Sequence, residues 1–178
     1  SPTDLNGKRV GIRAYSVTTA AWIRGVLQND HGVDLDSVKW VTFEEPHVAE
    51  YADPPTAVRA AVGKSIVQML LDGELDAGLV GAADLKDSRL QPVIANPSEA
   101  ALAWCERNQA APINHMLVVK QSLLNANPSA VREVFRLLRA SKTAAPPAQK
   151  ALDPIRFGVE DIRRSLALIV DYSAQQKL

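Results

Sequence analysis

A polar segment that runs from Arg13 to Thr19 carries the side chains best suited to bind an anion. It stands between a β-type run and a helical pattern, so we expect it to connect the end of a strand to the start of a helix. The first N–H groups of a helix lack intrahelical partners and carry a partial positive charge, which attracts carboxylates and phosphates. Ser16, Thr18 and Thr19 add hydroxyl donors, and the Arg13 guanidinium can bind a carboxylate through two hydrogen bonds. The segment predicts an anion site; the alternative is a plain helix cap at Thr18 or Thr19 with a solvated Arg13.

The sequence EEPH at positions 44–47 is a second candidate, because carboxylates and an imidazole can exchange protons with a substrate or hold a metal ion. It directly follows the alternating run 38–43, which predicts a strand. In an open α/β sheet, ligands bind outside the carboxyl ends of the strands, where this turn and the segment 13–19 would both lie. Glu45 is the carboxylate that we consider as proton donor or base. The alternative is a solvated acidic turn without chemistry.

His115 is the third candidate acid or base, and it lies in the apolar run 113–120, which predicts a further strand. The alternative is a structural histidine within that strand. The sequence contains no HExxH, CxxC, EF-hand or GxGxxG motif, and the GKS sequence at 63–65 has Val58 where a Walker A motif needs glycine. No cofactor is therefore predicted, while a divalent metal ion stays open. The single cysteine, Cys105, is interpreted as structural.

The elements that must position these residues alternate between strands and helices. This pattern predicts an α/β fold with a mostly parallel sheet flanked by helices. We expect strands at 9–15, 38–43, 75–81 and 113–120, and helices from Ala20 to Gly32, at 65–71 and at 97–107. Residues 44–55 are polar, contain proline and are irregular, which is typical of a segment that lines a cleft.

Two amphipathic helices are expected in the C-terminal part of the chain. Their apolar residues recur at helical spacing, at Val131, Val134, Phe135 and Leu138 in one helix and at Ile162, Leu166, Ile169 and Val170 in the other. The Ala- and Pro-rich segment 143–154 between them predicts a loop. We therefore divide the chain into a ligand-binding α/β lobe, 1–120, and a helical segment, 121–178.

The composition narrows the function classes. The chain has 178 residues with 20 basic and 20 acidic side chains, so its formal net charge is zero. A nucleic-acid-binding protein needs a positive surplus to neutralise phosphates, so this class is excluded as the main function. No apolar run approaches the roughly 20 residues that span a bilayer, and no signal peptide is visible at the start. We expect no membrane partner and a cytoplasmic location, and the lack of an initiator Met indicates a trimmed chain.

Three segments of the sequence resemble the 4,5-dihydroxyphthalate decarboxylase family. DLNGKRVGIRAYSVTTAAWIRGVLQNDHGVDLDSVKWV is similar to the family's GK-R-VG-R-YS-TT-xWxRGxLxxxxGVD pattern. PINHMLVVKQSLLNANPSAVREVF is similar to its later histidine-bearing strand and the helix that follows, and FGVEDIRRSLALIVDYSAQQKL to its terminal helix. More distantly, GKRVGI and LLDGELDAGLVG are similar to the second lobe of ABC-transporter solute-binding proteins.

The family resemblance implies a type 2 periplasmic-binding-protein-like lobe. It also implies activity on an aromatic ring with two vicinal carboxylates and two hydroxyls, which loses carbon dioxide to leave 3,4-dihydroxybenzoate. The motif positions that carry over are Arg13, Tyr15, Ser16, Thr18, Thr19, Trp22, Arg24, His115 and Glu160. In this interpretation Arg13 and the segment Tyr15–Thr19, with Trp22, bind the aromatic carboxylate, while His115 and Glu45 exchange protons with it.

The resemblance also implies a further lobe of about a hundred residues before this segment, the size of a small domain. The C-terminal helices would pack on that lobe, and without it we expect them to cover a second copy of the chain. We expect the chain alone not to decarboxylate. The alternative function is a non-catalytic solute-binding protein for a small carboxylate, a periplasmic transporter receptor or a sensor with the same kind of lobe.

Overall fold

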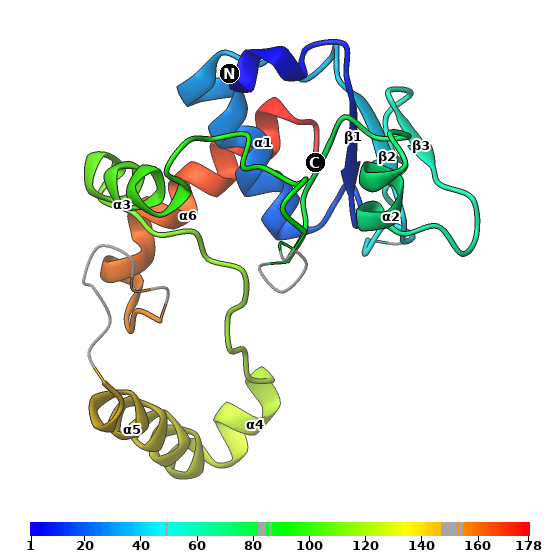
Figure 1. Ribbon diagram of the computed structural model, residues 1–178. Helices are drawn as coiled ribbons and strands as arrows, with labels where there is room; N and C mark the ends of the chain where they lie inside the picture. Colours follow the sequence, from blue (N-terminus) through cyan, green and yellow to red (C-terminus); the bar gives the residue numbers. More distant parts are fainter. Residues whose placement is uncertain (49, 82–84, 86, 147–152, 154) are drawn as a thin grey trace. The chain divides into compact units, whose positions relative to one another are not determined.

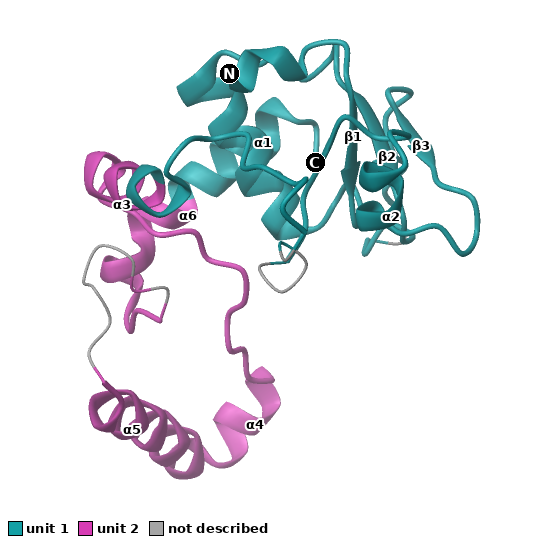
Figure 2. Ribbon diagram, in the orientation of Figure 1, with its two compact units in different colours: residues 1–100, 167–178 teal, residues 101–166 magenta. Residues whose placement is uncertain are grey.

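The computed structural model describes residues 1–48, 50–81, 85, 87–146, 153 and 155–178. The chain forms two compact units, residues 1–100 with 167–178, and residues 101–166 (Figure 2). We call them unit 1 and unit 2. Among the described residues, no helix is long and apolar enough to cross a membrane.

Unit 1 is built on a parallel sheet of four short strands (Figure 1). In chain order they are β1 Arg9–Ile12, β2 Lys39–Thr42, β3 Ala57–Arg59 and β4 Ala77–Gly78, and in the sheet their order is β3-β2-β1-β4. The α/β fold with a parallel sheet is thus confirmed. The third strand was not predicted, because its three residues follow an irregular stretch and none of them is buried.

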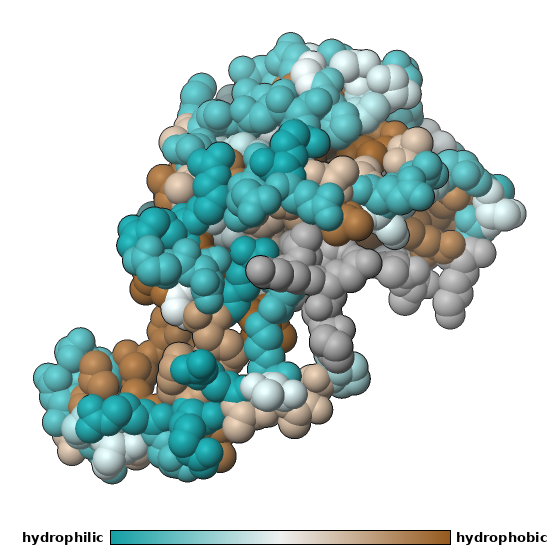
Figure 3. All heavy atoms as spheres, turned by 90° about the vertical axis from the view of Figure 1, so that its left-hand side faces the viewer, coloured by the Kyte–Doolittle hydropathy of each residue, from teal (hydrophilic) through white to brown (hydrophobic). Residues whose placement is uncertain are grey.

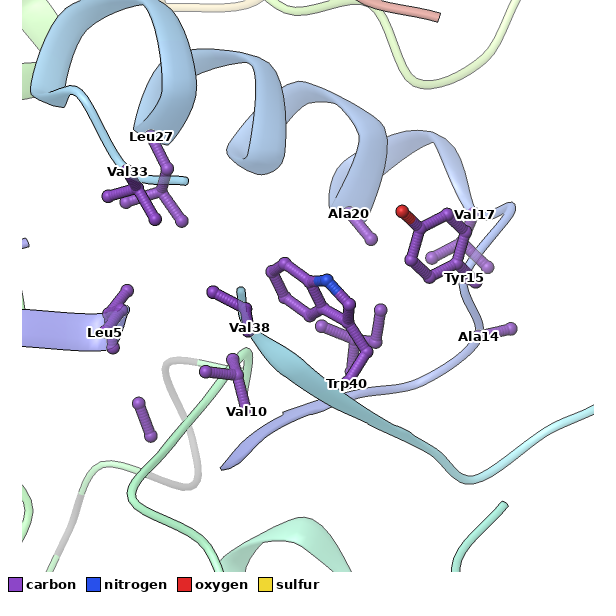
Figure 4. Packing of buried hydrophobic residues seen from close by; sticks show 12 residues of the cluster. Leu5, Val10, Ala14, Tyr15, Val17, Ala20, Leu27, Val33, Val38 and Trp40 are labelled. Carbon is purple, nitrogen blue, oxygen red and sulfur yellow. The ribbon is translucent and has the colours of Figure 1, made fainter. Parts of the chain in front are cut away.

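Helix α1, Thr18–His31, covers one face of the sheet and encloses the main core (Figure 4). The strands alternate, so Val10 and Trp40 face this core while their neighbours face the other side of the sheet. The helix ends as predicted at Gly32, which adopts a left-handed conformation with φ 68° and donates its N–H to the Gln28 carbonyl. The short 3-10 helix η1, Pro2–Leu5, adds Leu5 to the same core.

Helix α2, Ile66–Leu71, lies against the opposite face of the sheet, where Val41, Met69 and Leu75 form a smaller core. Its N-cap is Ser65, whose hydroxyl accepts the Gln68 N–H at 3.2 Å. A Cβ on Gly11 would lie 2.7 Å from Leu75 Cδ1, so any larger residue in β1 would displace the Leu75 side chain.

Helix α6, Val159–Gln175, crosses the boundary between the units, and its residues from Ala167 onward belong to unit 1. Leu168, Tyr172 and Gln176 are buried at a spacing of four residues. The Tyr172 ring meets the Trp22 ring edge-on, with centroids 5.8 Å apart, and it occupies the space that a Cβ on Gly25 would need. This end of α6 therefore packs closely on α1.

Unit 2 holds most of α3, Pro97–Asn108, and the helices α4, Gln121–Ala126, and α5, Pro128–Ala144. The predicted strand at 113–120 is wrong: these residues have no regular structure, and all but Ile113 are exposed. A strand needs a neighbour to pair with its backbone groups, and the described part of unit 2 contains none. Helix α4 was not predicted, and most of the predicted loop 143–154 lies outside the described residues.

The amphipathic helix α5 is present as predicted, but none of its residues is buried. Its apolar stripe is exposed, and Figure 3 shows apolar side chains at the surface where α4 and α5 lie. The segment before it adds further exposed apolar side chains, from Met116 to Val119.

Candidate anion-binding site

The ends of β1 and β2 bring the two predicted polar segments together. The Arg13 carbonyl accepts the backbone N–H groups of both Phe43 and Glu44, at 2.9 and 2.8 Å. These two hydrogen bonds hold the beginnings of the two polar segments together. Arg13 Nε lies 3.2 Å from Glu44 Oε2, and the same carboxylate oxygen lies 3.4 Å from His47 Nε2. The backbone N–H of His47 donates to Ser16 Oγ at 3.1 Å. We call Arg13, Ser16, Glu44 and His47 the edge cluster.

The side chains of the edge cluster remain accessible to solvent. Arg13 is 59% exposed, Glu44 50% and His47 46%. Paired surface charges are stabilised only weakly in water, so a ligand carboxylate can replace Glu44 as the partner of Arg13 at small cost. The cluster thus combines a guanidinium that can take a second anion with an imidazole held near it.

Helix α1 begins next to this cluster, with Val17 as its N-cap. The alternative of a plain cap at Thr18 or Thr19 is therefore wrong: Thr18 is the first helical residue, and the valine side chain accepts no hydrogen bond. The positive end of the helix dipole faces the edge, and the Val17 N-cap supplies neither a carboxylate nor a hydroxyl to it. Thr19 is exposed, while Ser16 and Thr18 are half-buried at the same end of the helix.

Two pockets adjoin the cluster and share Val48 and Tyr51 as a common wall. The smaller, of about 190 Å³, is lined by Ser16 and Thr18 together with Ile169 and Ser173 of α6 and Leu178. The larger, of about 560 Å³, is lined by Thr42, Glu45, Pro46, Val48, Tyr51, Ala52, Asp53, Ala57 and Arg59. Its volume falls within the range of roughly 300–1,000 Å³ that is usual for small-molecule sites. Both pockets lie in unit 1, where the irregular segment 44–55 meets the strand ends.

Two residues predicted to bind ligand have packing contacts instead. Tyr15 is 5% exposed and Trp22 2%. The Tyr15 ring packs edge-on to Trp40, with centroids 6.2 Å apart, and stacks on Tyr51 at 6.4 Å. Burial raises the pKa of the Tyr15 phenol above its usual range, so the phenol is neutral at physiological pH. Tyr15 therefore packs in the core next to the strand-end edge, and Trp22 packs α1 against α6.

The two residues predicted as catalytic lie outside the edge cluster. Glu45 points to Arg59, with 2.9 Å between Oε1 and Nη2, and is 88% exposed. His115 belongs to unit 2, where its side chain is exposed in the irregular segment. The imidazole that the structure does bring to Arg13 is that of His47, which the sequence analysis named only as part of the EEPH turn.

A buried arginine, Arg24, lies close to the strand-end edge. The family resemblance marks it as a motif position, and the sequence predicts no role for it. Arg24 is 1% exposed; its Nε donates to Gln176 Oε1 at 2.7 Å and its Nη2 donates to the Tyr15 carbonyl at 2.8 Å. The guanidinium carbon lies 3.8 Å from the centre of the Tyr15 ring. Burial lowers the pKa of Arg24 to about 10, so the side chain is still charged at neutral pH.

The arrangement can bind a small carboxylate and transfer a proton to it. Arg13 and the N-terminus of α1 supply positive charge, and His47 supplies an acid or base within the same cluster. Among the described residues, no group of three or more His, Cys, Asp or Glu side chains gathers as a metal site would require.

Comparison with known proteins gives two curated relatives. The chain is 31% identical over 157 residues to a 4,5-dihydroxyphthalate decarboxylase of Comamonas testosteroni, an alignment that covers 82% of this chain and 47% of the relative. It is 30% identical over 115 residues to a 4,5-dihydroxyphthalate decarboxylase of Pseudomonas putida, covering 58% of this chain and 45% of the relative. No protein-family profile matches the chain. The resemblance drawn from the three sequence segments is thus confirmed, and the chain spans just under half the length of each relative.

Proposed function

We propose, from this relationship to the 4,5-dihydroxyphthalate decarboxylases, that the chain is the carboxylate-binding lobe of an aromatic-acid decarboxylase. The observation that carries the proposal is the edge cluster, where Arg13 and His47 share one carboxylate oxygen of Glu44. The substrate would be 4,5-dihydroxyphthalate and the products 3,4-dihydroxybenzoate and carbon dioxide. The finer fold assignment, a type 2 periplasmic-binding-protein-like lobe, belongs to the same proposal, and it is supported by the parallel sheet with helices on both faces.

Arg13 is the proposed carboxylate-binding residue. In the structure its guanidinium pairs with Glu44 at the surface, and a substrate carboxylate takes the place of that glutamate. The N–H groups at the start of α1 and the Ser16 and Thr18 hydroxyls lie at the same edge and can bind the second, vicinal carboxylate. A ring with two adjacent carboxylates therefore fits this edge better than one with a single carboxylate.

His47 is the proposed proton donor. When carbon dioxide leaves, the bond between the ring carbon and the carboxylate breaks and its electron pair stays on the ring carbon. That carbon must then take up a proton, which a protonated imidazole can deliver. Glu44, with Oε2 3.4 Å from His47 Nε2, orients the imidazole ring. His115 and Glu45 stay predicted alternatives for this role.

The remainder of the parent protein is proposed to supply the second wall of the site. The edge cluster is half exposed, and a water-filled edge cannot hold the ring in one orientation or keep competing water out. We expect the 178-residue chain to bind aromatic dicarboxylates without releasing carbon dioxide from 4,5-dihydroxyphthalate. Release of carbon dioxide by the chain alone, measured against a heat-denatured control, would show that one lobe contains the whole site.

The three histidines of the chain provide the test. We propose to follow their ring signals by NMR while phthalate, a non-reacting aromatic dicarboxylate, is added. The His47 signals should move with a saturable dependence on phthalate. His31 is the internal control, because it ends the 14-residue helix α1 and so lies about 20 Å from the helix N-terminus.

The titration also separates the two predicted proton donors. Movement of His115 together with His47 would place both imidazoles at the ligand, and movement of His115 alone would transfer the role to it. Isophthalate, whose carboxylates are not adjacent, is the matched probe and should bind more weakly. If phthalate moves none of the three histidines, the proposed site is wrong.

A further inference from the structure

Arg24 holds a buried positive charge that its hydrogen-bond partners do not balance. Gln176 and the Tyr15 carbonyl are neutral, and Nη1 is a buried atom with no hydrogen-bond partner among the described residues. A charged group without a counter-charge in the interior is costly, because the lost hydration is only partly replaced. An anion close to the guanidinium would therefore stabilise this buried charge.

Asp53 has the complementary feature. Its Oδ1 is also buried and lacks a hydrogen-bond partner among the described residues. Burial raises the pKa of the Asp53 carboxyl above its usual range; the charge of Glu45 adds to this effect, and the positive charges of Arg59 and Arg24 oppose it. Arg59 is already paired with Glu45 at 2.9 Å, which leaves Arg24 as the cation without a carboxylate. Burial is the main cause of the lowered pKa of Arg24, and the opposing effects come from Tyr15, Tyr51 and the Asp53 carboxylate.

Two stacked tyrosines connect Arg24 to the segment that carries Asp53. The Arg24 guanidinium lies over the Tyr15 ring at 3.8 Å, and Tyr15 stacks on Tyr51 with 10° between the ring planes. Tyr51 stands two residues before Asp53 and four after His47. The stack therefore connects the buried arginine to the same segment that carries the edge cluster.

We propose that Asp53 is the charge partner of Arg24, and that this pair clamps Tyr51 onto Tyr15. The clamp fixes the irregular segment from 44 to 55 in its middle, while the Arg13 carbonyl and strand β3 fix its two ends. Arg24 and Asp53 are thus positioning residues for Glu44 and His47. The inference rests on the proposed function of this edge as a carboxylate site.

The test uses Asp53→Asn in the 178-residue chain, with Asp171→Asn as the matched control because Asp171 is an exposed aspartate of α6 in the same unit. Without ligand, Asp53→Asn should remove the nuclear Overhauser contacts between the Tyr15 and Tyr51 rings and shift the His47 ring signals. The affinity of Asp53→Asn for phthalate should be at least about tenfold lower than that of the wild-type chain, the equivalent of one lost charge-assisted contact. Asp171→Asn should change none of these.

The readouts keep the clamp separate from the proposed function. If wild type does not bind phthalate, the carboxylate site is wrong, while the ligand-free ring contacts still decide the clamp. If Asp53→Asn unfolds, Tyr51→Leu replaces it, and Tyr51→Phe should restore the ring contacts and the His47 signals. Ring contacts and His47 signals that match wild type in Asp53→Asn, with or without a lower melting temperature, would overturn the proposal.

Discussion

The sheet of unit 1 and helix α5 of unit 2 differ in how far their apolar side chains are buried. In unit 1, helices pack on both faces of the sheet, and Val10, Trp40 and Leu75 are buried. In unit 2, helix α5 buries none of its 17 residues, and Phe135 and Leu138 remain 46% and 41% exposed. Unit 1 thus has a buried core, whereas α5 presents an exposed apolar surface, although Trp104 and Cys105 of α3 are buried in unit 2.

The difference indicates which part of the chain is stabilised by a core of its own. Burial of an apolar side chain stabilises the folded state by roughly 1.5–3 kcal/mol, so unit 1 obtains its stability internally. An exposed apolar stripe of several residues is characteristic of a surface that another chain or domain covers. We infer that unit 1 carries the binding site and that unit 2 carries the surface for assembly.

The largest expected effect compares one aromatic residue from each unit. Trp40 is 1% exposed in the core of unit 1, so Trp40→Ala should lower the free energy of unfolding by about 3–5 kcal/mol. Phe135→Ala in α5 should lower it by less than about 1 kcal/mol, because nearly half of that side chain is already in water. Urea unfolding of both variants gives the comparison, and equal losses would contradict it.

The second effect concerns assembly. We expect the chain to form a homodimer through α5 and α6 at high micromolar concentration, because the exposed apolar side chains Val134, Phe135 and Leu138 of α5 and Val170 of α6 are then removed from water. Leu138→Glu should shift light scattering from dimer to monomer. Arg136→Gln in the same helix is the control and should leave the dimer intact. A wild-type chain that stays monomeric at every concentration would contradict the proposed dimer.

The smallest effect is a pH dependence at the start of the sheet. Asp76 accepts hydrogen bonds from the Arg9 N–H, Nε and Nη2 at 2.9, 3.0 and 3.2 Å, which lower the pKa of the carboxyl to about 2. Because the folded-state pKa lies below the ordinary 3.8, the stabilisation is complete above that value and is lost as the pH falls toward 2.

Asp76→Asn should therefore destabilise unit 1 at neutral pH by about 1 kcal/mol, a value reduced for solvent screening of this one-third-exposed side chain. The difference in unfolding free energy between Asp76→Asn and wild type should disappear as the pH approaches 2. Urea unfolding at several pH values measures it, with Asp171→Asn as the control. A difference that stays constant with pH would mean that the ion pair is not its cause.

The sequence predicted the parts of unit 1 that depend on local pattern and chain order. Strands β1, β2 and β4, helices α1 and α2, and the Gly32 cap follow from periodicity and turn chemistry. The meeting of Arg13 with the EEPH turn followed from the rule that parallel strands end at one edge. These features need no knowledge of distant contacts.

What could not be predicted depends on contacts across the chain. The Arg24–Gln176 hydrogen bond joins residues 152 positions apart, and no local pattern distinguishes Arg24 from a surface arginine. Tyr51 and Asp53 lie in a stretch without periodicity. The strand predicted at 113–120 failed for the opposite reason: its apolar pattern is present, but the described chain offers no strand to pair with it.

The central claim is that the strand-end edge of unit 1 binds an aromatic carboxylate through Arg13. Calorimetric titration with phthalate tests it most directly, using Arg13→Gln and, as a matched control, Arg136→Gln. Both arginines are exposed and paired with a glutamate, at 59% and 50% exposure for Arg13 and Glu44 and 62% and 54% for Arg136 and Glu133. Loss of one charge-assisted contact to a carboxylate should weaken binding by about ten- to a hundred-fold in Arg13→Gln alone. Equal phthalate affinity in wild type and Arg13→Gln would contradict the account.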